Sequence, residues 1–138
     1  MNLQSATGIV SLFSVYAPTM MYDSDIRDQF YEELDNEVRS IPETEEVFLL
    51  GDFNARVGSD RLAWPDCLGS YGTGKLNDNG QRLLEMCAIH SLCVTNTFFK
   101  VKERHRATWK HPRSGHWHQL DMIITRRASI VNVLIARS

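Results

Sequence analysis

The sequence lacks a paired-cysteine framework, a long hydrophobic run and an excess of charge of one sign. Its three cysteines, Cys67, Cys87 and Cys93, form no Cys-x-x-Cys pair, so we expect buried reduced thiols rather than disulfides or a zinc site. No apolar run approaches the length that spans a membrane, and residues 1–10 lack the basic-then-apolar pattern of a signal peptide. We therefore expect an intracellular protein, nuclear or cytoplasmic, with no membrane partner.

The net charge of −2 gives no general affinity for polyanions, so contact with a nucleic acid would need a local basic patch. A length of 138 residues is enough for one domain, and hydrophobic content of 43% is typical of globular proteins. The ends are unusual, because domains commonly have polar termini, whereas residues 130–138 predict a strand that stops abruptly. This favours a chain that is part of a larger domain.

The order of apolar patterns predicts an α/β (α+β) fold with a mixed sheet and helices outside it. Residues 9–16 and 47–50 predict strands, and residues 24–41 and 81–90 predict helices. The buried stripe of the first helix is predicted at Ile26, Phe30, Leu34, Val38 and Ile41. Residues 59–79 predict a long loop, a kind of segment that is often functional. Further strands are predicted at residues 92–96, 107–110, 115–125 and 130–138.

Asp52 and Asn54 follow the predicted strand 47–50 after a glycine. In an extended segment, side chains two positions apart face the same side. The carboxylate can accept a proton from water or bind a cation, and the amide can donate to a phosphate oxygen. Ligand sites of α/β proteins lie beyond the carboxyl ends of strands. Asp and Asn are also ordinary turn residues. These residues by themselves therefore support two interpretations equally, a polar turn or half of an active site.

Two other polar residues stand at informative places in the predicted strands. Asp121 lies between Leu120 and Met122, where a buried carboxylate is costly unless it is paired or metal-bound. We favour a functional role for Asp121 over a strand end at the surface. Tyr16 ends the first strand, where a phenol can bond a phosphate oxygen, although packing is the commoner role of such a tyrosine.

Basic and aromatic side chains alternate in residues 100–118. Such a patch can contact phosphates and stack on bases, although an ordinary solvated hairpin has the same composition. Four histidines lie there, at 105, 111, 116 and 118, but their spacing matches no standard structural zinc site. The predicted nucleic-acid-binding residues are Arg56, Arg106, Trp109, Lys110, Arg113 and Trp117.

Several motifs, read together and in order, resemble the endonuclease/exonuclease/phosphatase superfamily. They are Val15-Tyr16-Ala17-Pro18, Gly51-Asp52-Phe53-Asn54, Thr108-Trp109 and Gln119-Leu120-Asp121-Met122-Ile123. Three further stretches resemble the endonuclease domains of non-LTR retrotransposons and the craniofacial development protein 2-like proteins. These stretches are residues 51–58, 77–84 and 109–114.

The resemblance implies a partial four-layer α/β sandwich of the DNase I-like type and hydrolysis of a DNA phosphodiester assisted by Mg²⁺ or Mn²⁺. By motif position, Tyr16 matches the tyrosine that contacts the scissile phosphate. Asp52 matches the aspartate that orients or deprotonates the attacking water, and it is a possible metal ligand. Asn54 matches the amide that holds the phosphate, and Asp121 matches the aspartate that pairs with the catalytic histidine.

The resemblance also implies elements that these 138 residues do not contain. The family's metal-binding glutamate precedes the first motif, and its final Asp-His pair follows the last strand. None of His105, His111, His116 and His118 has the position of that histidine. We therefore interpret residues 1–138 as the carboxyl-terminal portion of one endonuclease domain, with an apolar sheet face or an edge left exposed.

Two main functional hypotheses follow from this interpretation. In the first, the chain is part of a working nuclease whose other segments lie elsewhere in a longer protein. In the second, favoured for these residues taken alone, it is a non-catalytic, retrotransposon-derived remnant that binds a nucleic acid or a protein. A phosphatase acting on a small phosphoester is a third alternative.

Overall fold

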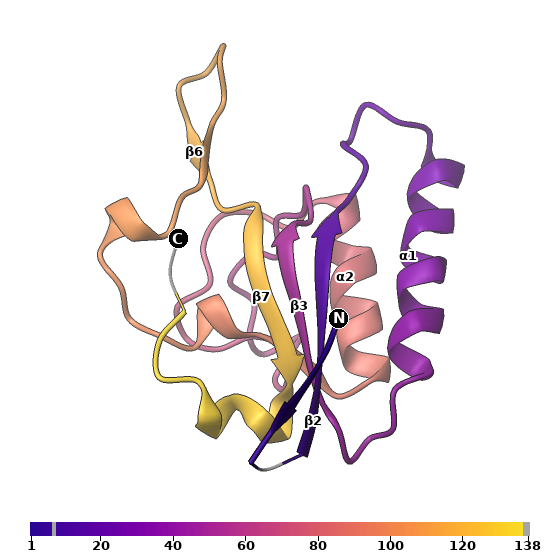
Figure 1. The fold of residues 1–138 in the computed structure, drawn as a ribbon. Helices are drawn as coiled ribbons and strands as arrows, with labels where there is room; N and C mark the ends of the chain where they lie inside the picture. Colours follow the sequence, from indigo (N-terminus) through magenta and orange to yellow (C-terminus); the bar gives the residue numbers. More distant parts are fainter. Residues whose placement is uncertain (7, 137–138) are drawn as a thin grey trace.

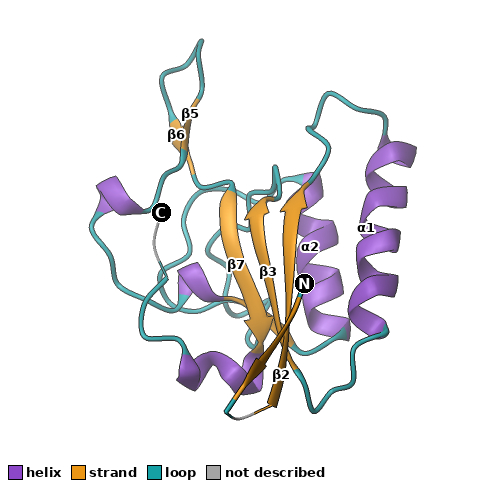
Figure 2. Ribbon diagram, in the orientation of Figure 1, coloured by secondary structure: helices purple, strands orange, loops and turns teal. Residues whose placement is uncertain are grey.

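The computed structural model describes residues 1–6 and 8–136, and its centre is a five-stranded mixed sheet (Figures 1 and 2). Its strand order is β1-β2-β3-β7-β4, in which β2 and β3 are parallel and the other neighbours are antiparallel. A two-stranded sheet of β5 and β6 stands apart from it as a hairpin. The strands are β1 (Asn2–Ser5), β2 (Gly8–Tyr16), β3 (Glu46–Asp52), β4 (Leu92–Val94), β5 (Trp109–Lys110), β6 (Trp117–His118) and β7 (Asp121–Arg126). The predicted mixed sheet is confirmed.

Both α-helices pack on the same face of the large sheet (Figure 1). Helix α1 (Ser24–Arg39) connects the parallel strands β2 and β3, and α2 (Asp78–Ile89) precedes β4. A side-chain contact joins the two helices at the end of α2, where His90 Nε2 lies 2.6 Å from Asp35 Oδ1. No helix in the described part of the chain is long and apolar enough to cross a membrane.

The buried stripe of α1 agrees with the predicted one at Leu34 and Val38 but differs from it in the first turn. Its buried residues are Arg27, Tyr31, Leu34 and Val38, whereas Ile26 is 46% exposed. A series of steps of four residues rotates steadily around a helix with 3.6 residues per turn. Alternating steps of four and three follow one face, and the sheet selects that face.

Several segments differ from the predicted strands. Residues 95–97 form the 3₁₀-helix η1 (Thr95–Thr97), and the predicted strand 115–125 is divided between β6 and β7. The predicted strand 130–138 is wrong in its described part, because η3 (Arg127–Asn132) occupies its beginning and Leu134 is 92% exposed. Residues 137–138 lie outside the described residues. A β-branched sequence forms a strand only beside a partner, and no strand pairs with residues 133–136. The remaining 3₁₀-helix is η2 (Glu103–His105).

The two faces of the large sheet have different surroundings. Val47 and Leu49 of β3 point to the helices and are fully buried. Leu12, Phe48 and Leu50 alternate with them onto the other face, where they are half-buried or exposed. In the described residues, no α-helix covers this second face (Figure 2).

The loop predicted over residues 59–79 ends at residue 77, because α2 begins at Asp78, and it contributes to the core. Its Cys67 and Leu68 are buried, and the carbonyl of Cys67 accepts a 2.9 Å bond from the backbone N–H of Val94. All three cysteines are free and buried, as predicted. Burial raises the pKa of the Cys67 thiol to about 11 and that of Cys93 to about 12, so both thiols are protonated at neutral pH.

Candidate active site

The ends of three neighbouring strands bring three predicted residues into one row. Tyr16 is the last residue of β2, Asp52 the last of β3 and Asp121 the first of β7. The strand register pairs Tyr16 with Asp52 and Asp52 with Asp121. Antiparallel partners place their side chains on one face with Cβ atoms about 4.5–5.5 Å apart, so the two carboxylates are neighbours.

A glycine allows this row to form. Gly51 has a φ of +142°, and a Cβ on it would lie 2.0 Å from the carbonyl oxygen of Val15. Strands β2 and β3 could not approach this closely with any other residue there. Beyond Gly51, backbone bonds hold the strand ends together, from Ala17 N–H to the Asp52 carbonyl and from Phe53 N–H to the Leu120 carbonyl.

Asn54 lies next to the row in a left-handed conformation, with φ of 44°. Its backbone N–H donates to Asp52 Oδ1 at 2.8 Å, and its side-chain amide donates to the Ala17 carbonyl at 2.7 Å. The predicted geometry was therefore wrong, because the chain is not extended between Asp52 and Asn54. The two side chains still reach the same site, through a local turn of the kind that asparagine favours.

Asn77 and Asn79 connect helix α2 to both site loops. Asn77 Oδ1 accepts from the backbone N–H of Gly80, which caps the helix, and from that of Arg56. Asn79 is fully buried and donates to the carbonyls of Pro18 at 2.9 Å and Asn54 at 3.1 Å. The loops after β2 and β3 are thus held against each other by one amide group.

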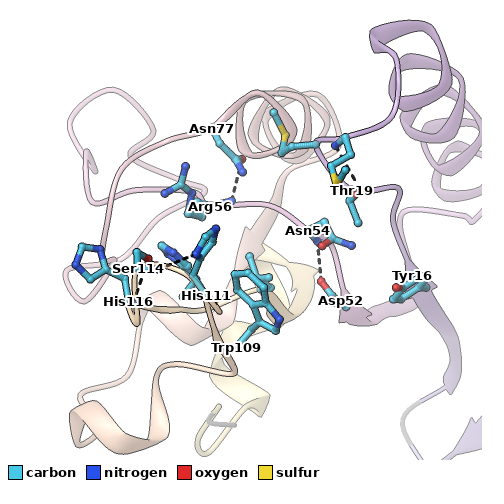
Figure 3. Close-up of a pocket in the computed structure, with 14 residues that line it drawn as sticks. Tyr16, Thr19, Asp52, Asn54, Arg56, Asn77, Trp109, His111, Ser114 and His116 are labelled. Atoms are coloured by element: carbon cyan, nitrogen blue, oxygen red, sulfur yellow. Dashed lines mark hydrogen bonds between the residues drawn. The ribbon is translucent and has the colours of Figure 1, made fainter.

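A cavity of about 800 Å³ opens beside the row (Figure 3). Tyr16, Asp52 and Asn54 line it together with Arg56 and Trp109. Asp121 does not line it, and it is exposed rather than buried, so the burial on which its prediction rested is wrong. Its place beside Asp52 is set by the pairing of β3 and β7.

The β5–β6 hairpin forms the opposite wall of the cavity (Figure 3). The ring of Trp109 stacks on His118, with centroids 6.0 Å apart, and meets the edge of His111 at 5.4 Å. Thr108 ties the hairpin to β7, because its Oγ1 accepts from the backbone N–H groups of Leu120 and Asp121. The wall is therefore aromatic and anchored to the carboxylate row.

Of the predicted nucleic-acid-binding residues, only Arg56 and Trp109 line this cavity. Arg106 and Trp117 line a separate pocket, and Lys110 and Arg113 line neither of the two. The lining residues that the sequence interpretation did not assign to a site are Thr19, Met20, Met21, Asn77, Ser114 and Leu120. The helix-capping pattern at Asn77 could have indicated from the sequence that this residue is structurally important, whereas residues 19–21 have no pattern that predicts a place in a site.

Three histidines, His111, His116 and His118, also line the cavity, although their sequence indicated only a basic patch. Burial, Arg56 and the two other imidazoles lower the pKa of His118, which is therefore uncharged at neutral pH. Burial and the neighbouring Asp121 raise the pKa of Asp52, against the opposing effect of the hydrogen bond from Asn54 N–H. The site thus combines a carboxyl group of raised pKa at Asp52 with an uncharged imidazole at His118.

The raised pKa of Asp52 predicts that its charge costs stability. Above its folded-state pKa, the ionised carboxylate disfavours the folded protein, and this cost is removed as the pH falls through that pKa. Asp52→Asn keeps an oxygen acceptor for Asn54 N–H. Asp52 is only partly buried, so solvent screens its charge, and we expect the exchange to raise the free energy of unfolding at about pH 7 by about 0.2–1 kcal/mol, measured by urea denaturation.

The gain should disappear near pH 3, below the ordinary aspartate pKa of 3.8, because the carboxyl group is then protonated in both the folded and the unfolded protein. Asp66→Asn, an exchange at an exposed position, is the matched control and should change stability little at either pH. A gain of Asp52→Asn that persists at low pH would show that the charge is not its cause.

The sheet order, the helices on one face and the polar row at the strand ends define an α/β domain of the endonuclease, or DNase I-like, type. Among solved structures, it matches the endonuclease domain of TRAS1, a telomere-specific non-LTR retrotransposon, with a TM-score of 0.58. The match covers 94% of this chain and 50% of that chain at 13% sequence identity, so it shows the fold.

Among curated proteins, the chain is 36% identical over 118 residues to craniofacial development protein 2 of Bos taurus and 33% identical over 118 residues to that of Tragulus javanicus. Each match covers 86% of this chain but only 20% of the relative's length. No family model matches the chain. Homology to these proteins and the endonuclease fold confirm the relationship to the endonuclease/exonuclease/phosphatase superfamily that the motifs predicted.

Proposed function

We propose that the chain carries the phosphate-binding and water-activating part of a DNA endonuclease site that works with a divalent cation. The observation that supports it most is the row of Tyr16, Asp52 and Asp121 beside Asn54, at the edge of a cavity with an aromatic wall. These are a phenol, two carboxylates and an amide, the groups that bind a phosphate and activate water.

Each residue has a role that its surroundings support. The Tyr16 side chain is 76% exposed, so its hydroxyl can donate to a phosphate oxygen. Asn54 uses one amide hydrogen on Ala17, and its second can donate to the same phosphate. Asp52 lines the cavity, where its carboxylate can accept the proton of the attacking water. Asp121, beside Asp52, holds negative charge next to the reacting water.

The donor set fits one mode of Mg²⁺ binding. In the described residues, no cluster of three or more His, Cys, Asp or Glu side chains could hold a metal ion, so there is no all-protein cage. Mg²⁺ is often held by one or two carboxylates together with substrate phosphates, and paired Asp52 and Asp121 supply that number. A cation bound there would offset the charge of the phosphate and of the leaving oxygen.

Plasmid nicking tests this function. We expect the purified chain with Mg²⁺ to convert supercoiled plasmid to the nicked form, and Asp52→Asn to slow this about 10²–10⁴-fold, the usual contribution of a general base. Asp66→Asn is the matched control, an exposed carboxylate outside the site, and should nick like the wild type. Nicking that survives Asp52→Asn unchanged would assign the activity to a contaminant and contradict the proposal.

A second candidate is a non-catalytic module that binds nucleic acid. The absence of a third clustered metal donor in the described residues favours it. It predicts that the wild type and Asp52→Asn both bind an oligonucleotide and that neither nicks plasmid. The tryptophan-bearing wall favours a nucleic acid over a small phosphoester in either case.

A further inference from the structure

The β5–β6 hairpin has two faces that carry different groups. The register pairs Trp109 with His118 and Lys110 with Trp117. Because side chains alternate along a strand, the first pair faces one side of the ribbon and the second pair faces the other. Trp109 and His118 line the candidate active site. Lys110 and Trp117 therefore face away from it.

A second pocket, of about 620 Å³, lies against this other face. It is lined by Trp117 with Arg104, Arg106, Ala107 and Thr73. Its volume falls in the range of about 300–1,000 Å³ that is typical of small-molecule sites. The pocket thus combines an indole ring with two guanidinium groups.

The charged groups around Trp117 are arranged for an anionic, aromatic ligand. The indole is 60% exposed, and the ammonium of Lys110 lies 5.8 Å from its centroid. Arg106 Nε donates to the Val101 carbonyl at 3.1 Å, which holds the guanidinium and leaves its Nη groups as donors. An indole binds a nucleobase by stacking, and guanidinium groups bind phosphate.

A third, smaller cavity adjoins both the second pocket and the candidate active site. This cavity, of about 120 Å³, is lined by Arg56 and His118, which also line the active-site cavity. It is lined as well by Thr73 and Trp117, which also line the second pocket. The three cavities therefore follow one another across the base of the hairpin.

We propose that this second pocket is a nucleotide subsite, in which a base of the bound strand stacks on Trp117 and its phosphate contacts Arg106 and Arg104. This inference rests on the proposed function, which identifies the ligand as a DNA strand. Another nucleotide of the same DNA strand occupies the active-site cavity. The hairpin then separates two nucleotides of one strand, with Trp109 on the first and Trp117 on the second.

Fluorescence anisotropy with labelled oligothymidylates in EDTA tests this subsite without hydrolysis. The wild type should bind the octanucleotide more tightly than the dinucleotide, because only the longer strand reaches both faces. Trp117→Ala should weaken octanucleotide binding about 5- to 100-fold, the effect of one stacked base, and leave dinucleotide binding unchanged. Trp117→Phe should restore most of the affinity. Trp109→Ala, on the other face, should weaken both oligonucleotides.

Arg106→Gln should lower the slope of log affinity against log salt by about 0.7, as expected for the loss of one phosphate contact to a single strand. Circular dichroism of each variant verifies that it is folded. Octanucleotide binding that Trp117→Ala does not change, or that equals dinucleotide binding in the wild type, would overturn the subsite.

The two proposals fail separately. If Asp52→Asn abolishes nicking but Trp117→Ala leaves octanucleotide binding unchanged, the protein has the active site without the subsite. If the wild type does not nick plasmid but Trp117→Ala weakens octanucleotide binding, the protein has the subsite without the proposed endonuclease activity. A wild type that binds no oligonucleotide contradicts the subsite outright.

Discussion

Gly51→Ala is expected to leave the protein unfolded or to lower its free energy of unfolding by more than about 4 kcal/mol. The new Cβ would lie 2.0 Å from the Val15 carbonyl oxygen, on a backbone with φ of +142° that L residues rarely adopt. Both atoms belong to paired central strands, so neither can move without separating β2 from β3. Urea denaturation followed by circular dichroism measures the effect.

Gly8→Ala separates the two causes of this loss. Gly8 has a similar φ of +139°, but apart from its chain neighbours no described residue lies within 4 Å of a Cβ built there. Gly8→Ala should therefore show the cost of the backbone conformation alone, about 1–3 kcal/mol. If the two variants lose equal stability, the close approach of the strands at Gly51 is not the reason for the glycine.

Asn79→Ala is expected to lower the free energy of unfolding by about 2–4 kcal/mol. The substitution removes the donor that serves the partly buried carbonyls of Pro18 and Asn54, and an acceptor left unpaired away from water costs about 1–3 kcal/mol. Because these carbonyls belong to the loops that carry Tyr16 and Asp52, site function should fall as well. Urea denaturation and octanucleotide binding measure the two effects.

Asn79→Asp keeps the shape of the side chain but has no N–H to donate and introduces a buried charge. It should therefore be at least as destabilising as Asn79→Ala. Asn36→Ala, at an exposed position of α1, is the matched control and should stay within about 0.5 kcal/mol of the wild type. A well-tolerated Asn79→Asp would mean that the two donated bonds do not hold the loops.

Prediction from the sequence succeeded where the signal was local. Helices α1 and α2 and strands β2 and β3 lie where the apolar periodicity predicted them, because periodicity reports neighbours within a few turns or strand residues. It was wrong for residues 95–96 and 130–136, whose composition favours a strand. Strand formation there needs a partner, and the partner is chosen elsewhere in the chain.

The sequence by itself determined which residues the candidate site holds and that they stand at strand ends: Tyr16 before Ala17-Pro18, and Asp52 and Asn54 after a glycine. The tertiary structure decided which of these residues meet. Pairing of β3 with β7 sets Asp121 beside Asp52, and one buried amide joins the loops at Pro18 and Asn54. The two faces of the hairpin, one toward Asp52 and one toward Arg106, also arose only from the fold. These contacts join distant segments through strand register and buried hydrogen bonds, which no local pattern of residues encodes.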